Sequence, residues 1–292
     1  MTIASWVRRH PLTAYFALAY GISWGGILIL LAGKGFHLAV HQPQDRGLFF
    51  VLMLLGPSTS GLALTAVLDG RAGLHELWMR LTRWRVGPQW YAVALLTTPL
   101  LVLAILWPLS AFVSPAFAPR FQAAFFALGL VVGSFEEIGW TGFATPRLLH
   151  DHSPPMAGAL LGLGWALWHL VADATGNIST MGIAWFAWFA VFWMAALPAY
   201  RILMTWVYAN SKSVLLAVLM HAGYTGWLFV LYPATSFGQG LVWQAGFAAS
   251  LWVAAAIVGR WGGPAGERVS GGTTRLPPSD GDVAAPVGRG PA

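Results

Sequence analysis

The sequence predicts an all-α fold, a polytopic membrane helix bundle with about eight transmembrane helices. Of its 292 residues, 57% are hydrophobic, only 9% are charged and 17 are Trp, a composition far from that of ordinary soluble domains. Apolar runs recur along the chain, and each is close to the ~20 residues that a helix needs to cross the hydrocarbon core. The runs lie near residues 12–32, 48–68, 90–113, 121–139, 156–175, 181–200, 213–232 and 241–259.

The polar composition excludes several classes of function. The chain has no cysteine, which excludes disulfides, cysteine-ligated zinc and thiol nucleophiles. Its excess of basic residues does not indicate a nucleic-acid partner, because these residues stand singly between apolar segments instead of forming a basic face. We interpret them as the residues that orient the chain in the lipid bilayer.

The distribution of Lys and Arg predicts a multi-pass protein of the cell membrane with cytoplasmic N- and C-termini. Alternating the connections between the two sides puts most basic residues on one side, which is the cytoplasmic side in membrane proteins. The inner group comprises Arg8, Arg9, Arg71, Arg80, Arg83, Arg85, Arg147, Arg201, Lys212, Arg260, Arg268, Arg275 and Arg289, and the outer group comprises Lys34, Arg46 and Arg120.

Composition also divides the chain into two parts. Residues 1–260 form the expected transmembrane domain. Residues 261–292 are rich in Gly, Pro and Ser and poor in bulky apolar residues, so we predict a disordered cytoplasmic tail. The connection at 68–90 mixes Leu and Trp with Arg, which is typical either of a segment lying on the inner membrane surface or of a plain loop.

Four ionisable side chains stand in or near the apolar segments, and they are the candidate functional residues. They are Glu136, Glu137, His169 and His221. Burying such a group in a membrane costs on the order of a few kcal/mol unless it is paired, neutral or hydrated. Because a bundle can bring groups from several helices to one polar cavity, we predict that Glu136, His169 and His221 line a common site.

Helical spacing gives three of these groups a neighbour one turn away. The pairs are Glu137 with Thr141, His169 with Trp165, and His221 with Thr225, each at i, i+4 on one helix face. The adjacent glutamates instead point about 100° apart. We therefore expect one of them to face the cavity and the other to make a structural contact.

One carboxylate and two imidazoles support hydrolysis by either of two routes. Glu136, His169 and His221 are suitable ligands for a divalent metal such as zinc, which lowers the pKa of a bound water. Alternatively, the glutamate acts as a general base on a water that the histidines position. The sequence pattern leaves both routes open.

Three segments in this order resemble the motifs of the CPBP (Abi) family, the CAAX proteases and bacteriocin-processing membrane proteins related to the Rce1-type prenyl protease. They are EEIGWTGFATPRLL at 136–149, WALWHL at 165–170 and SVLLAVLMHAGYT at 213–225. The similarity extends over about residues 10–230, with the motif-bearing core at about 121–230.

The resemblance implies an intramembrane endopeptidase whose cavity opens toward the cytosol. Its substrates would be membrane-associated peptides or proteins, including CAAX-type or lipidated ones. By the same resemblance, Glu136 would activate the water, while His169 and His221 would position it or bind a metal and support the developing oxyanion.

The chain departs from the family motifs at three positions, and these departures bear on whether it is active. Thr141 stands where the first motif has Arg, so we expect Glu137 to be protonated or to pair with Arg147. Trp165 replaces a Phe, which we expect to affect packing. Thr225 replaces Asn or Asp and offers a hydroxyl of shorter reach.

Two other interpretations remain open. A catalytically inactive CPBP-like scaffold or immunity protein would use the same polar residues only to stabilise helix packing. A transporter would use them as a proton relay, an interpretation disfavoured because the sequence has no evident inverted repeat.

Overall fold

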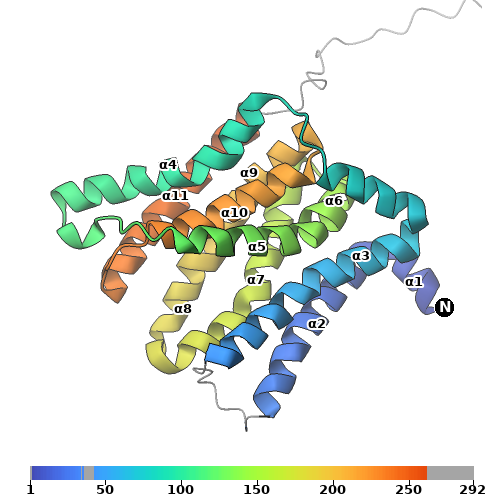
Figure 1. Ribbon diagram of the computed structural model, residues 1–292, viewed down its shortest axis with the longest axis horizontal. Coiled ribbons are helices and arrows are strands. Elements are labelled where there is room, and N and C mark those ends of the chain that lie inside the picture. The colour runs from blue at the N-terminus through green and yellow to red at the C-terminus, as the bar shows by residue number, and fades with distance from the viewer. Residues whose placement is uncertain (1, 34, 36–42, 262–292) are drawn as a thin grey trace, which may run out of the picture.

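The computed structural model describes residues 2–33, 35 and 43–261, which form helices joined by short connections (Figure 1). Within these ranges there is no β-strand. The predicted tail falls outside the described residues except for residue 261, which ends the last helix. In chain order the elements are α1 (Ile3–Arg9), α2 (Pro11–Ala32), α3 (Pro43–Leu81), α4 (Pro88–Phe112), the 3₁₀ turn η1 (Pro115–Phe117), α5 (Ala124–Gly139), the π-helical turn η2 (Trp140–Ala144), α6 (Thr145–Asp151), α7 (Pro154–Met181), α8 (Ala184–Phe189), the π-helical turn η3 (Ala190–Ala195), α9 (Ala196–Ser211), α10 (Val214–Val230) and α11 (Phe237–Trp261).

Six helical runs in the described part of the chain are long and apolar enough to cross a bilayer. They are α2, α3 from residue 47, α4, α7, the continuous run from α8 to α9, and α11. The shorter helices α5 and α10, with 16 and 17 residues, complete a set of eight that follows the predicted segments in order. The fold class, an all-α polytopic membrane bundle, is thereby confirmed.

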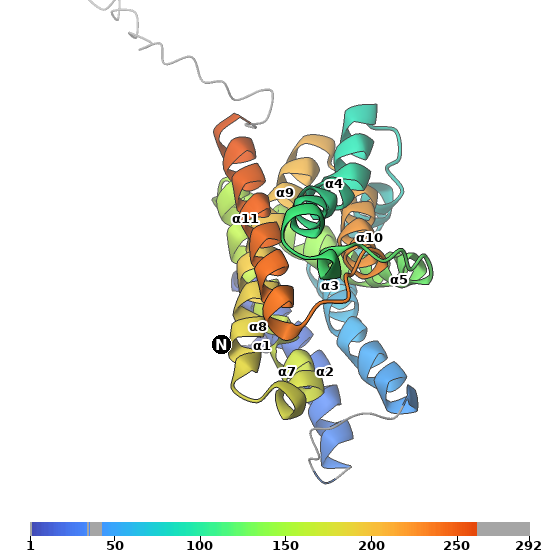
Figure 2. The same ribbon diagram turned by 90° about the vertical axis from the view of Figure 1, so that its left-hand side faces the viewer.

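Three pairs of helices make the main contacts of the bundle. α5 packs along α10, α7 along α9, and α2 along α3 (Figures 1 and 2). The first two pairs carry the predicted catalytic residues Glu136, His169 and His221. The fold therefore positions the site mainly through how closely these helices approach each other.

Glycines allow this close approach. A Cβ atom added to Gly133 of α5 would lie 2.8 Å from the carbonyl oxygen of Val218 on α10. One added to Gly162 of α7 would lie 2.4 Å from the Cα atom of Pro198 on α9. Separations this short exclude any side chain, so glycine at these two positions sets the helix spacing.

The arginine-rich connection after the second span is partly helical. α3 bends at Gly70, whose φ of 64° is readily adopted only by glycine. The helix then continues to Leu81, with Leu77 buried against the bundle and Trp78 and Met79 exposed. Of the two alternatives for residues 68–90, the structure favours a packed surface segment over a plain loop.

Candidate active site

A cavity of about 470 Å³ lies among α3, α5, α7, α8 to α9, and α10. Its wall includes Glu136, His169 and His221, together with Trp165 and Thr225. The structure therefore brings the three predicted catalytic residues from three helices into one cavity. Their roles in catalysis stay predictions.

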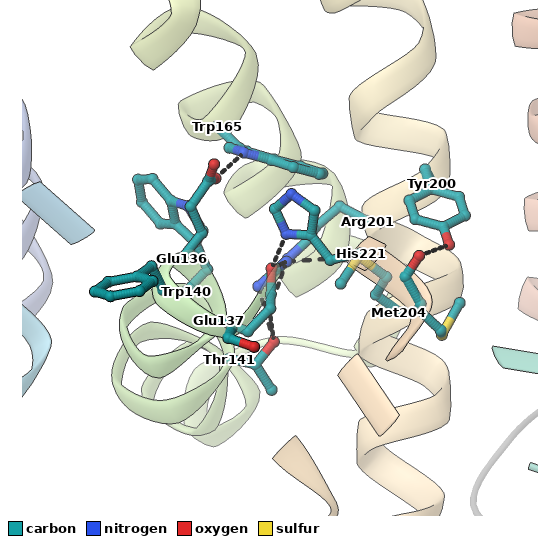
Figure 3. A network of polar contacts seen from close by, with 12 residues as sticks. Glu136, Glu137, Trp140, Thr141, Trp165, Tyr200, Arg201, Met204 and His221 are labelled. Atoms are coloured by element: carbon teal, nitrogen blue, oxygen red, sulfur yellow. Dashed lines mark hydrogen bonds and ion pairs between the residues drawn. The ribbon is translucent and has the colours of Figure 1, made fainter. Parts of the chain in front are cut away.

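Glu136 is fixed by two tryptophans. It is only 2% exposed, and its Oε2 atom accepts a hydrogen bond from Trp165 Nε1 at 2.8 Å and from Trp140 Nε1 at 3.1 Å (Figure 3). Both donors bind Oε2. None of the described residues donates a hydrogen bond to Oε1. The sequence analysis assigns to Trp165 an effect on packing alone. In the structure its indole also orients the Glu136 carboxylate.

Glu137 is completely buried and has an ion-pair partner that the sequence analysis missed. Arg201 Nη1 lies 2.8 Å from Oε1 and 3.0 Å from Oε2 of Glu137, and Nη2 donates to Thr141 Oγ1 at 3.0 Å (Figure 3). The Thr141 hydroxyl in turn donates to Glu137 Oε2. The expectation that Glu137 pairs with Arg147 is wrong, because Arg147 pairs with Asp69 on the bundle surface. The guanidinium of Arg201 favours an ionised Glu137 over the protonated form that was the other expectation.

The assignment of Arg201 to an inner connection is also wrong. The sixth predicted segment was expected to end at Tyr200, whereas α9 continues to Ser211. Arg201 therefore lies within a helix, is 0% exposed, and places its guanidinium carbon 5.6 Å from the centre of the Trp165 ring. The sequence indicates that the helix continues past Arg201, because the apolar residues Ile202, Leu203 and Met204 follow it.

The two histidines are held by hydrogen bonds from their Nδ1 atoms. Nδ1 of His221 lies 2.8 Å from Glu137 Oε1, and Nδ1 of His169 lies 2.9 Å from the Trp165 carbonyl oxygen. A carbonyl only accepts hydrogen bonds, so we assign a proton to Nδ1 of His169, and the carboxylate supports the same assignment for His221. In both rings, Nε2 is then the atom available for chemistry.

The sequence analysis missed two further residues of the cavity wall, Trp193 and Asp173. The Trp193 ring stacks on His169 with centroids 3.8 Å apart and an interplanar angle of 17°. Asp173, one turn beyond His169, accepts hydrogen bonds from Trp185 Nε1 at 2.6 Å and Asn177 Nδ2 at 3.0 Å. An acid within the apolar run 156–175 was the signal for Asp173, whereas only the fold brings Trp193 to the histidine.

The predicted metal ligands do not fit a zinc site in this arrangement. Zinc in proteins is held by three or four ligand atoms at about 2.0–2.3 Å. Among the described residues, no group of three or more His, Asp and Glu side chains is arranged to hold a metal ion. Glu136 also directs one oxygen to two indole groups, so we derive no step through a metal.

The fold and the cavity define a multi-pass membrane protein with a buried glutamate–histidine site. Residues 118–227 match the family model described as Type II CAAX prenyl endopeptidase Rce1-like. The resemblance to the CPBP family is therefore confirmed over the segment that contains all three motifs.

Similarity to a curated protein indicates the same family. The chain is 33% identical over 113 residues to CAAX prenyl protease 2 of Methanococcus maripaludis. This similarity covers 36% of the chain and 40% of the relative, so the chain matches less than half of that protein's length.

Proposed function

We propose that this protein is an intramembrane endopeptidase that cleaves membrane-associated peptides or proteins. The observation that carries the proposal is the convergence of Glu136, His169 and His221 on one cavity within the apolar bundle. The similarity of residues 118–227 to Rce1-like endopeptidases supports peptide bonds as the target. CAAX-type and lipidated peptides are therefore the first substrates to test.

In the proposed reaction Glu136 is the general base. Its Oε1 takes a proton from a water held between this oxygen and Nε2 of His169, and the water oxygen bonds to the peptide carbonyl carbon. The carbonyl oxygen becomes an oxyanion. As the C–N bond breaks, the proton held by Glu136 passes to the leaving nitrogen, which gives a carboxylic acid and an amine.

We assign to His221 the stabilisation of the oxyanion. In its cationic form a histidine donates from both nitrogens, so His221 donates from Nδ1 to Glu137 and from Nε2 to the oxyanion. Donors that are already oriented toward developing charge lower the barrier most in a water-poor site. Glu137 thus acts through His221 as a positioning residue, and Arg201 holds Glu137 in place.

We also propose that the protein lies in the cell membrane with both termini cytoplasmic. Removing the buried Arg201 from the inner group leaves the bias of Lys and Arg toward one end of the bundle intact. Two hydrogen bonds support the interpretation that the basic connections lie at the same end of the bundle. Ser213 Oγ donates to the Arg83 carbonyl oxygen, and Arg80 donates to the Tyr208 hydroxyl. Such a bias is typical of the cytoplasmic side.

The proposed function is tested by Glu136→Gln. Gln keeps the shape of Glu but cannot accept the proton of water, so we expect cleavage to fall by on the order of 100-fold or more, measured with purified protein in lipid nanodiscs on fluorogenic membrane-associated peptides. The matched control is Glu76→Gln, which changes an exposed carboxylate far from the cavity and is expected to leave cleavage unchanged.

Two results would contradict the proposal. Equal cleavage by wild type and Glu136→Gln would mean that the active site lies elsewhere. A wild-type protein that cleaves none of the peptides, with or without added zinc, would favour the inactive scaffold or immunity protein.

A further inference from the structure

The two histidines of the cavity are held by hydrogen bonds of different strength. Nδ1 of His221 lies 2.8 Å from the carboxylate of Glu137, whereas Nδ1 of His169 donates to a neutral backbone carbonyl at 2.9 Å. A hydrogen bond to an ionised group is about twice as strong as one between neutral groups. The hydrogen bond of His169 therefore restrains its ring less than that of His221 does.

Rotamer preference does not fix the His169 ring either. The torsion about the Cβ–Cγ bond of a histidine joins an sp³ carbon to an sp² carbon and has broad energy wells. A carbonyl oxygen also accepts hydrogen bonds over a broad range of directions. The ring of His169 can therefore tilt while its hydrogen bond is kept, and such a tilt displaces Nε2 relative to Glu136.

Two tryptophans supply the missing restraint. The indole of Trp193 lies face to face with the His169 ring, with centroids 3.8 Å apart and planes inclined by 17°. The Trp168 ring meets the same imidazole at nearly a right angle, with centroids 4.9 Å apart and an interplanar angle of 81°. Because protein interiors are closely packed, a tilt of the imidazole would separate it from one indole or press it against the other.

Trp193 is itself fixed by the fold. It lies in η3, a π-helical turn that is wider than an α-helical turn because its backbone hydrogen bonds run from residue i to i+5. η3 lies against α7, and the Phe192 ring packs on the Trp193 ring at 4.6 Å and 80°. Helical backbone, and not a loop, thus presents the indole to His169. Turns of this kind are frequent at functional sites.

We propose that Trp193 is a positioning residue for the hydrolytic reaction, because its indole face holds the His169 ring where Nε2 reaches the water on Glu136. This inference rests on the proposed function and adds a residue that acts through His169. Proton transfer from water requires hydrogen-bond reach, and a displacement of about 1 Å can cost on the order of 100-fold in rate.

Two substitutions at one position test the role in catalysis. Trp193→Leu removes the aromatic face, and Trp193→Phe keeps a smaller one. We expect Trp193→Leu to lower kcat by roughly 10- to 100-fold with KM changed less, and Trp193→Phe to recover most of this loss, measured per mole of folded protein in lipid nanodiscs. The control is Trp107→Leu, at an exposed position of α4, which is expected to keep the kcat of wild type.

Nuclear magnetic resonance tests the positioning without cleavage. The chain has eight histidines, and in protein whose histidines carry carbon-13 at Cε1 the signal of His169 is assigned by its loss in His169→Gln. Nuclei above an indole face resonate at lower frequency because of the ring current. We expect the His169 signal to move to higher frequency in Trp193→Leu, to move less in Trp193→Phe, and to stay in place in Trp107→Leu.

Three results would overturn the inference. They are a wild-type kcat in Trp193→Leu, an equal loss of kcat in Trp193→Leu and Trp193→Phe, and a His169 signal that does not move when the indole is removed. An equal loss would follow the packing volume at this position and not the orientation of the imidazole.

The two readouts also separate this inference from the proposed function. A wild-type protein that cleaves no peptide, but whose His169 signal moves as expected, would contradict the proposed function and support the positioning of His169 by Trp193. An active protease whose His169 signal stays in place in Trp193→Leu would do the reverse.

Discussion

Arg201 of α9 and Glu137 of α5 form an ion pair inside the bundle, with Nη1 2.8 Å from Oε1 and both side chains 0% exposed. In the CPBP motif the arginine stands one turn after the second glutamate, where this chain has Thr141. The guanidinium that serves this carboxylate therefore comes from a different helix. Thr141 remains part of the network because its hydroxyl bridges Glu137 and Arg201.

The first prediction concerns this relocated arginine. Arg201→Met removes the guanidinium that pairs with the buried Glu137 and leaves His221 as its remaining partner. Breaking a buried pair costs roughly 3–5 kcal/mol, so we expect a lower unfolding temperature in detergent and little cleavage. Adding Thr141→Arg to Arg201→Met returns a guanidinium to the position of the family motif. We expect the double variant to recover part of both the stability and the activity.

Thr141→Arg alone is the control for this exchange. It places two guanidinium groups around one carboxylate, so we expect it to be less stable than wild type. A double variant that is no better than Arg201→Met would show that the two positions are not interchangeable.

The second prediction separates the two glutamates. Glu137→Gln removes the negative charge that Arg201 and His221 share, so we expect both a loss of stability of roughly 3–5 kcal/mol and slower cleavage. Glu136 forms no ion pair with a described arginine and accepts hydrogen bonds from two indole groups, so Glu136→Gln should lose cleavage with a smaller change in unfolding temperature. Comparing unfolding temperature with kcat for both variants checks the distinction, and indistinguishable stabilities would contradict it.

The third prediction tests the spacing of α5 and α10. Gly133→Ala puts a methyl group 2.8 Å from a backbone oxygen and 2.9 Å from a backbone nitrogen of α10, so the helices must separate and the Glu137 contact with His221 must lengthen. We expect a lower unfolding temperature and weaker cleavage. Gly21→Ala in α2 has no atom within 4 Å of its new methyl and is expected to be neutral or slightly stabilising. Equal effects would argue against close packing at Gly133.

The fourth prediction concerns Thr225, which lines the cavity one turn beyond His221. Thr225→Asn restores the longer amide of the family motif, and one additional oxyanion donor is worth about 100-fold or more in the best cases. We expect kcat to rise by roughly 10-fold with KM less affected. Thr225→Val, which has the same shape without the hydroxyl, should not increase it. A fall in kcat for Thr225→Asn would mean that Thr225 is already the better donor here.

The fifth prediction concerns metal removal. Because the described Glu and His side chains are not arranged as a metal site, we expect cleavage to survive treatment with a strong chelator followed by gel filtration. Metal content before and after treatment is measured by mass spectrometry. Loss of activity that is restored by zinc and not by magnesium would contradict the general-base route.

The sequence by itself determined the fold class and the candidate site. Apolar runs of bilayer length require helices, because backbone groups in lipid must be satisfied within the segment. An ionisable residue in such a run is costly and therefore conspicuous, which is why Glu136, His169 and His221 could be selected before the structure was known. The three ordered motifs added the family.

The tertiary structure decided which partners these residues have. Periodicity relates residues within one helix, so it related Glu137 to Thr141 and gave no means of finding Arg201, 64 residues away in the chain. The same limit applies to Trp193, which meets His169 only because η3 lies against α7. Pairing between helices depends on how closely their backbones approach, and that distance is a property of the packed bundle.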